Sequence, residues 1–203
     1  MTAIEELERE RTRAPSIPDA DQQLIQRTLD GDMHAFEQLV QRHRDVVFRV
    51  ASRIVGTDHA DDVSQDAFLR AFHRLGRFRG DSSFRTWLLQ ITQNAALNEL
   101  QRSRRRQTED GEASDPVDPD RTRQPASELE RRERQQRLET KLGLLRDEYR
   151  SLLVLRDLEG LSYSEIAEVL EMPLGSVKGR LHRARGELIA LLRTNTYDWE
   201  LPT

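Results

Sequence analysis

The chain has 203 residues, in which 36 acidic side chains outnumber 32 lysines and arginines, so its formal net charge is −4. It contains no cysteine, which excludes disulfides and thiolate zinc sites and fits a reducing compartment. Charged residues make up 33% and aromatic residues only 5%, a composition that favours small helical domains joined by polar segments over one large core.

The sequence predicts neither a secretory signal at its N-terminus nor a membrane-spanning helix. The N-terminal sequence MTAIEELERER is charged and lacks the apolar segment of a secretory signal. The longest run of Leu and Val, from Leu152 to Leu155, is far shorter than the roughly 20 apolar residues that a membrane-spanning helix needs. We therefore expect a cytoplasmic protein without membrane insertion.

The first half of the chain is patterned as helices. Residues 1–20 are charged and contain two prolines, and we expect a loose N-terminal extension there. Residues 21–106 are predicted to form a first helical domain, since apolar side chains such as Leu39, Val47 and Ile54 recur at helical spacing. Gly56 is expected to end one helix, Asp58 to cap the next, and Ser83 to cap a third.

The composition changes after this domain. Residues 107–128 contain seven acidic residues, two arginines and three prolines with almost nothing apolar, which predicts a flexible acidic linker. Helical patterning returns over residues 129–193, and residues 194–203 form a C-terminal tail. Because no strand alternation of useful length is present, we expect an all-α protein of two small helical domains, with the acidic linker between them.

The second domain contains the pattern of a helix-turn-helix. Ser162 and Glu165 form a capping box before one short helix, and Pro173 favours the first turn of the next. On that second helix one face is predicted to be apolar (Leu174, Val177, Leu181, Ala184 and Leu188), and the remaining face is basic and free of acids. Such a face fits the major groove of DNA; the alternative is that its arginines only keep a surface helix soluble.

Two stretches resemble the sigma factors of bacterial RNA polymerase, of the sigma-70 family and its small extracytoplasmic-function (ECF) type. The promoter-reading domain of that family is similar to the stretch LRDLEGLSYSEIAEVLEMPLGSVKGRLHRARGEL, from Leu155 to Leu188. The family's other domain is similar to HADDVSQDAFLRAFHRLGRFRGDSSFRTWLLQITQNAALNELQRSRRR, from His59 to Arg106. The resemblance covers about residues 21–192 and implies a protein that binds core polymerase and directs it to promoters.

The resemblance also implies where polymerase would dock. The pattern D-x-x-Q-[DE]-x-F of the family, which contacts a coiled coil of the largest polymerase subunit, is matched by Asp62, Gln65, Asp66 and Phe68, with Asp61 beside them. Residues three and four apart share one helix face, so the polar members should form a single surface. Helix-dipole compensation is an alternative role for the acids that lie in the first turn, and core packing is the alternative for Phe68.

The minus-ten element would be melted by the same domain. The loop from Gly76 to Ser83 resembles the family loop that captures a flipped base, and the helix after it changes from apolar to amide and basic side chains. The implied contact residues are Phe78, Arg79, Gly80, Asp81, Ser82, Ser83, Phe84, Arg85, Trp87, Gln90, Asn94, Asn98, Arg102, Arg105 and Arg106. Core packing for Trp87 and a solvated helix end for the last arginines remain alternatives. Asn98 departs from the Asp of many relatives.

The minus-thirty-five element would be read by the helix-turn-helix. The implied contact residues are Ser176, Lys178, Gly179, Arg180, His182, Arg183 and Arg185. Gly179 has no side chain with which to read a base, and His182 stands where relatives often have an aromatic or apolar residue. The acidic linker would run through polymerase toward the RNA exit path, or act as an inert tether.

The expected partners are core polymerase (its largest-subunit coiled coil and its flap), promoter DNA and an anti-sigma factor, and the free protein is expected to be a monomer. We expect no cofactor and no metal site. The five histidines show no metal spacing, and no phosphate-binding loop or nucleophile elbow is present, which argues against an enzyme. A dimeric helix-turn-helix regulator is the main alternative, but it leaves the acidic docking surface unexplained; a helical adaptor without DNA binding is another.

Overall fold

The computed structural model describes residues 20–110, 138 and 140–193, all of them helical or in short connections without a strand. The predicted all-α fold of two helical domains is confirmed. The predicted extension, most of the linker and the tail lie outside the described residues. No helix within the described ranges is long and apolar enough to cross a membrane.

The first domain is built from four α-helices and a short 3-10 turn. They are α2 (Ala20–Leu29), α3 (Met33–Val55), α4 (Thr57–Arg74), η1 (Leu75–Arg77) and α5 (Phe84–Asp110). Gly56 ends α3 as predicted, because its φ of 87° is a conformation that glycine adopts without strain. The prediction that Asp58 caps α4 is wrong. The N-cap of α4 is Gly56 and the helix starts at Thr57, two residues earlier than predicted, so Asp58 lies within its first turn.

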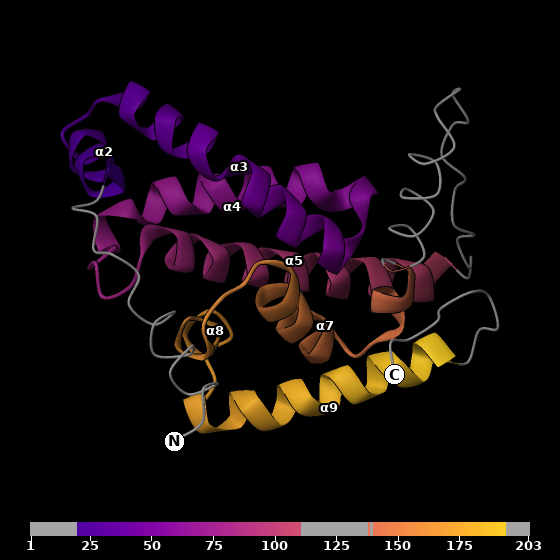
Figure 1. Cartoon of the computed structure of the whole chain (residues 1–203). Coiled ribbons are helices and arrows are strands. Elements are labelled where there is room, and N and C mark those ends of the chain that lie inside the picture. The colour runs from indigo at the N-terminus through magenta and orange to yellow at the C-terminus, as the bar shows by residue number, and fades with distance from the viewer. Residues whose placement is uncertain (1–19, 111–137, 139, 194–203) are drawn as a thin grey trace, which may run out of the picture.

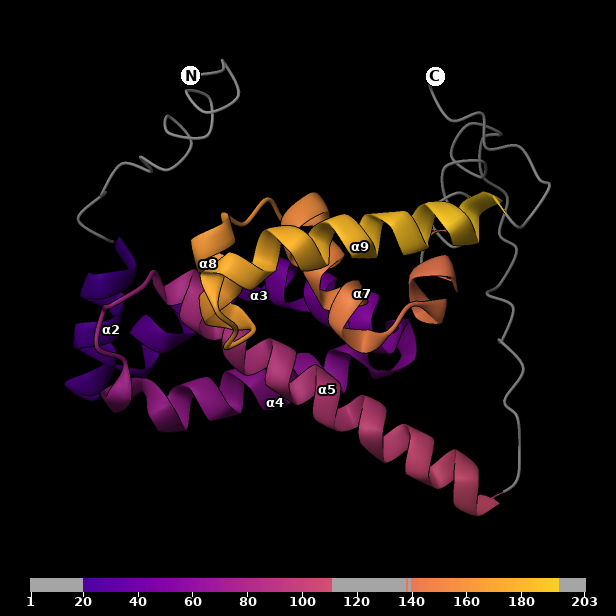
Figure 2. The same ribbon diagram turned by 90° about the horizontal axis from the view of Figure 1, so that it is seen from below.

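Helix α5 starts where the sequence predicts and ends later. The Ser83 hydroxyl accepts a hydrogen bond from the Thr86 amide (3.0 Å), which caps the first turn. Its first half is buried through Phe84, Leu88 and Ile91. The helix continues to Asp110, four residues beyond the predicted boundary at 106, and Figure 2 shows this end projecting past the other helices.

The second domain contains the predicted helix-turn-helix. Residues 140–144 are helical and are followed by α7 (Asp147–Leu153), the π-helical turn η2 (Val154–Leu158), α8 (Tyr163–Val169) and α9 (Leu174–Arg193). The capping box of Ser162 and Glu165 is confirmed at the start of α8. Helix α8 ends at Val169, earlier than the predicted stop near Met172.

The apolar face of α9 matches the prediction with one exception. Val177, Leu181 and Ala184 are at most 1% exposed and pack on α7 and α8. Leu174 is 56% exposed, so its predicted place on the buried face is wrong. It is the first residue of the helix, and the turn before it carries its side chain out of the core.

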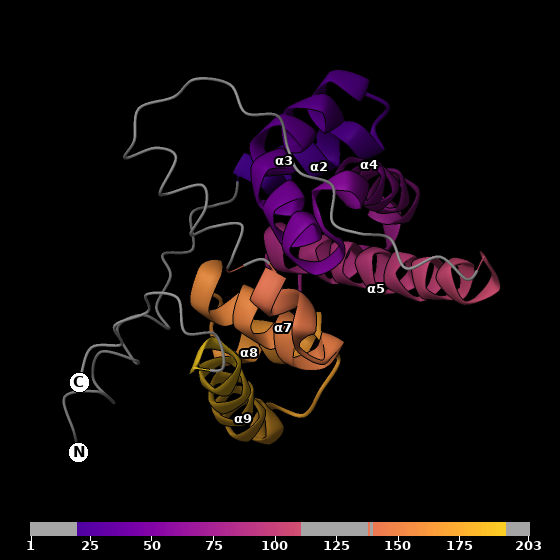
Figure 3. The ribbon, with the colours of Figure 1, turned by 90° about the vertical axis from the view of Figure 1, so that its right-hand side faces the viewer.

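The two domains pack directly against each other. In Figures 1 and 3, α7 and α8 lie between α9 and the helices of the first domain. One hydrophobic cluster includes Ile54 and Leu89 of the first domain together with Leu152 and Leu155 of the second. A second cluster, around Leu39, lies wholly within the first domain. The interface between the domains is therefore part of the protein's main core.

Candidate nucleic-acid interface

Helix α9 presents a solvent-facing surface opposite its buried side. Lys178, Gly179, His182 and Arg183 are exposed there, and Ser176 is half-buried. The helix has no acid in its first turn. Exposed lysine and arginine side chains on one helix face suit phosphates and guanine edges. The structure thus places these five predicted minus-thirty-five residues on or beside one surface.

Two other basic residues of α9 are held by acids of the same domain. Arg180 forms an ion pair with Glu148 of α7. Arg185 donates to both carboxylate oxygens of Asp157 (2.6 and 3.1 Å), and the hydrogen bonds to that carboxylate raise the pKa of the arginine. The sequence of α9 alone did not indicate these pairs, because Asp157 lies 28 residues away. They fix the flanks of the helix at the edge of the basic surface.

The loop before α5 is anchored by an aromatic cluster. Phe78, Phe84 and Trp87 pack with ring centroids 5.3–5.9 Å apart. Phe84 is 1% exposed, so core packing accounts for it, whereas Phe78 and Trp87 are half-buried. Gly80 has a φ of 77°, which favours glycine at this turn. Of the other loop residues predicted to contact DNA, Arg79, Asp81 and Ser83 are exposed and Ser82 is half-buried.

The C-terminal half of α5 exposes the predicted amide and basic side chains to solvent. Asn94, Asn98, Arg102, Arg105 and Arg106 are all exposed. Between this end of α5 and the start of α4 lies an open hollow of about 610 Å³, lined by His59, Asp62, Glu99, Arg102, Arg105 and Arg106. Within it Glu99 pairs with two of these arginines. The hollow therefore joins one predicted docking acid to the predicted DNA-binding arginines.

The predicted polymerase-docking residues lie on α4, but they face two directions. Asp61, Asp62 and Gln65 are exposed. Asp62 lines the hollow beside α5, whereas Asp61 lines a second hollow of about 440 Å³ between α3 and α4, which also contains Phe48 and Phe68. Half-buried Phe68 also packs against the core of the first domain.

Asp66 is less available than its neighbours on α4. Its carboxylate accepts hydrogen bonds from Arg70, one turn further on (2.7 and 2.8 Å), so the two charges largely neutralise each other. Of the predicted polar surface formed by Asp62, Gln65 and Asp66, the first two are therefore the more exposed members. Phe48 and Arg44, which line the second hollow from α3, were not predicted from the sequence, since α3 shares no motif with α4.

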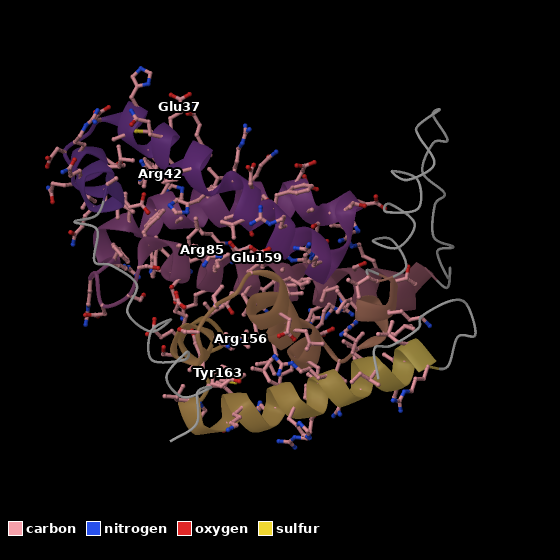
Figure 4. The ribbon with its side chains drawn as sticks, viewed as in Figure 1. Glu37, Arg42, Arg85, Arg156, Glu159 and Tyr163 are labelled. Atoms are coloured by element: carbon pink, nitrogen blue, oxygen red, sulfur yellow. The ribbon has the colours of Figure 1, made fainter. Side chains whose placement is uncertain are left out.

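Two predicted minus-ten residues contact the second domain. Arg85 donates to the carbonyl oxygen of Glu159 (3.2 Å), and Gln90 donates to the Glu171 carboxylate (2.8 Å). Figure 4 shows Arg85 and Glu159 side by side where α5 faces the segment before α8. Both residues are therefore bound to the second domain, although each is only half-buried.

The fold and these surfaces define a class of protein. Two helical domains, one with a helix-turn-helix and the other with an exposed amide and basic helix, are typical of DNA-binding transcription proteins. Comparison with known proteins narrows this class. Residues 39–106 match Sigma-70 region 2, and residues 135–188 match Sigma-70, region 4.

Individual relatives agree with these matches. The chain is 38% identical to the RNA polymerase sigma-H factor of Pseudomonas aeruginosa over 173 residues (81% of this chain and 90% of the relative). It is 36% identical to the ECF RNA polymerase sigma-E factor of Escherichia coli K12 over 172 residues, with the same coverage.

Solved structures give the same result. CnrH in complex with the cytosolic domain of CnrY has a TM-score of 0.64 at 34% identity, covering 88% of this chain and 100% of that one. The sigma factor RpoE in complex with the anti-sigma factor NepR from Bartonella quintana has a TM-score of 0.63 at 25% identity, covering 79% and 98%.

The chain belongs to the sigma-70 family of RNA polymerase sigma factors, in its extracytoplasmic-function group. Its function is to direct promoter-specific initiation of transcription by RNA polymerase. The first domain is the region 2 domain and the second is the region 4 domain. A dimeric regulator is disfavoured, because it would account for the second domain and not for the first.

Proposed function

We propose that α9 reads the minus-thirty-five element through Lys178, His182 and Arg183, with Ser176 and Gly179 allowing close approach of the DNA backbone. The observation that supports this assignment is the exposure of Lys178, His182 and Arg183 on the side of α9 that faces away from buried Val177, Leu181 and Ala184. Arg180 and Arg185 lie on the flanks, paired with Glu148 and Asp157, and would contact DNA phosphates if these pairs are exchanged.

The first domain is proposed to bind and melt the minus-ten element along α5. The loop from Phe78 to Ser83, with Trp87 behind it, provides a preformed place for an unstacked base, which costs on the order of a few kcal/mol to extrude. Asn94 and Asn98 continue the surface with amide groups suited to base edges, and the arginines at 102, 105 and 106 suit phosphates. The same proposed surface includes Arg85 and Gln90. Buried Phe84 supports the loop from beneath.

Polymerase docking is proposed to use α4. Asp61, Asp62 and Gln65 are the exposed polar residues of the matched motif, and Asp66 would join them if its bond to Arg70 is exchanged. The proposed contact is a coiled coil of the largest polymerase subunit, and the second domain would meet the flap. The hollow beside Phe48 and Phe68 offers apolar surface next to Asp61.

Three further assignments follow from family membership. We propose that an anti-sigma factor binds this chain, as NepR binds its sigma factor in the related structure. The protein is proposed to act in the cytoplasm as a monomer without catalytic activity or cofactor of its own. Its functional divisions are proposed at 21–106 for the region 2 domain and 129–193 for the region 4 domain. The acidic segment 107–128 lies between them, and the last residues of α5 form its start.

The docking proposal is tested by binding to core polymerase. In Asp62→Arg, a positive charge replaces an exposed acid of α4, and we expect affinity for core polymerase to fall at least about tenfold, since like charges across an interface cost several kcal/mol. Glu37→Arg is the matched control, because Glu37 is an exposed acid of the same domain on α3. Fluorescence anisotropy with labelled protein and purified core polymerase measures both. Equal affinities of the two variants would contradict α4 as the docking helix.

A further inference from the structure

Helix α2 lies against the loop that is proposed to capture a base. Figures 1 and 2 show α2 beside the connection from η1 to α5. At one end of α2, the Cδ2 atom of Leu29 lies 3.9 Å from the position that a β-carbon at Gly76 would occupy. Near the other end, the Nε2 atom of Gln22 lies 3.9 Å from the corresponding position at Gly80. The helix therefore follows this connection from η1 to the turn at Gly80.

No DNA-binding residue has been assigned to α2 so far. The helix precedes the stretch that matches Sigma-70 region 2, which begins at residue 39. The sequence motifs likewise place every proposed minus-ten contact on the loop or on α5. A role for α2 at the loop is therefore an inference from the three-dimensional arrangement alone.

Gln22 presents an exposed amide group to the loop. Gly80 has no side chain of its own, so the amide can approach the loop backbone at its turn. A flipped base is held by stacking on aromatic side chains and by hydrogen bonds to its edge. Phe78 and Trp87 supply aromatic rings behind this loop. An amide carries both donors and an acceptor, which suits the edge of a base stacked on those rings.

The start of α2 is fixed by a buried ion pair. The Asp21 carboxylate accepts hydrogen bonds from His43 (2.9 Å) and from Arg42, both of α3. Asp21 and His43 are 8% and 6% exposed. The His43 ring packs edge-on against Phe84, with ring centroids 5.3 Å apart. One imidazole therefore joins the first turn of α2 to the aromatic cluster that anchors the loop.

These contacts hold α2 in a definite position relative to the loop. A buried carboxylate that moved away from its partners would leave an unpaired charge in the protein, which is strongly unfavourable. Leu24 and Ile25 of α2 are also buried in the same hydrophobic cluster as Phe84. A recognition group must be held within about 0.5 Å of its working position before the ligand arrives. The Gln22 amide, which follows Asp21 in the chain, is supported in this way.

We propose that α2 forms a second wall of the base-capture site: the Gln22 amide bonds to the edge of the captured base, and the buried pair of Asp21 and His43 positions α2 for this contact. Gln22 is then a specificity-determining residue for the minus-ten element, whereas Asp21 and His43 are positioning residues. The ligand is one unstacked base of single-stranded DNA. The inference rests on the proposed capture of a base by the loop.

Selection of DNA by the holoenzyme tests the contact. Core polymerase is reconstituted with the parent protein or a variant and is mixed with a pool of duplex DNA that carries a randomised insert. Sequencing of the bound molecules gives the base preference at each minus-ten position. Trp87→Leu keeps an apolar side chain and removes the stacking ring, so it should identify the captured position as the one where the preference is lost.

Gln22→Ala should lower the base preference at this same position about tenfold, because one well-placed amide–base pair discriminates by about that factor. The preferences at the other positions should not change. Gln23→Ala is the matched control, since it removes an exposed amide from the next residue of the same helix. This control should select the same sequences as the parent.

The positioning pair is tested with His43→Phe, which keeps an aromatic ring against Phe84 and removes the hydrogen bond to Asp21. This variant should relax the preference at the captured position. When it is combined with Gln22→Ala, the preference should fall no further than with Gln22→Ala alone. A merely structural role would weaken binding to all sequences alike and would add to the effect of Gln22→Ala. Circular dichroism verifies that each variant keeps its helical content.

The outcomes separate this inference from the proposal on which it rests. If Trp87→Leu removes the preference at one position and Gln22→Ala leaves it intact, the loop captures a base without α2 and the inference is overturned. If Gln22→Ala weakens binding equally for all sequences, Gln22 does not determine specificity and the inference is again refuted. If Trp87→Leu changes no preference, base capture by the loop fails, and the role of α2 falls with it.

Discussion

Arg150 is a buried charge that joins several backbone carbonyls of the second domain to the first domain. Its side chain is 6% exposed, and its guanidinium donates to backbone carbonyls of Leu142 (2.8 Å), Gly143 (2.5 Å) and Leu145 (3.3 Å). A further bond reaches the carbonyl of Ile54 in the first domain (2.6 Å). Burial lowers the pKa of the guanidinium, which nearby Asp147 partly offsets. We predict that Arg150→Met destabilises the protein strongly.

The magnitude follows from the carbonyls that lose their partner. Leu142 and Ile54 are at most 2% exposed, so water does not replace the arginine there without local opening. Each buried acceptor left unpaired costs about 1–3 kcal/mol, and relief of the guanidinium's desolvation reduces the total to about 3 kcal/mol. Taking at least about 2 °C per kcal/mol, we expect the melting temperature to fall by about 6 °C or more.

Thermal unfolding followed by circular dichroism measures this difference, and Arg146→Met is the matched control. Arg146 lies four residues earlier, is 72% exposed, and pairs with Glu187 (3.2 Å). An exposed pair of this kind contributes about 0–1 kcal/mol. If Arg150→Met and Arg146→Met melt within about 1 °C of each other, the buried guanidinium does not stabilise the fold and the reasoning is refuted.

Three further predictions concern other parts of the chain. Burial raises the pKa of the Asp21 carboxyl, but hydrogen bonds from His43 and Arg42 outweigh this effect and hold the pKa below its usual range. The stability gained from these bonds is present above pH about 4 and is lost as the pH falls through the lowered pKa. The variant Asp21→Asn should therefore melt at a lower temperature than the parent at pH 7 and at the same temperature in acid, and a constant difference across a pH series would contradict this. Ser162→Ala removes the capping box of α8 and should cost about 1 kcal/mol in denaturant unfolding, whereas Ser164→Ala should cost little; equal costs would argue against the cap. Lys178→Ala should weaken holoenzyme binding to promoter duplex and reduce the salt slope by about one, without a change in melting temperature; an unchanged slope would exclude a phosphate contact.

The helices and their ends were largely predictable, because their signals are local. Gly56, Ser83 and the pair Ser162 and Glu165 each act within four residues of their own position, and each prediction is confirmed. The prediction for Asp58 is wrong because an acid close to a helix start suits both the N-cap and the first turn. The sequence pattern does not distinguish these two positions.

The contacts between distant residues were not predictable. Glu159 lies in the short sequence DLEG, which indicates only a turn, and the arginines of the first domain that bind it are 74 to 110 residues away. The acids that hold Arg180 and Arg185 likewise come from α7 and η2. The run of basic residues in the sequence predicted the basic face of α9 correctly. It did not predict the ion pairs of Arg180 and Arg185, because only tertiary packing brings the acidic partners close to α9.

The most direct test of the central claim is a run-off transcription assay. Purified bacterial core polymerase is supplied with genomic fragments, with and without this protein, and with Asp62→Arg in place of the parent. We predict transcripts that start at discrete sites only with the parent protein and are reduced with Asp62→Arg. Absence of any transcript, together with binding of the free protein to duplex DNA as a dimer, would contradict the assignment as a sigma factor.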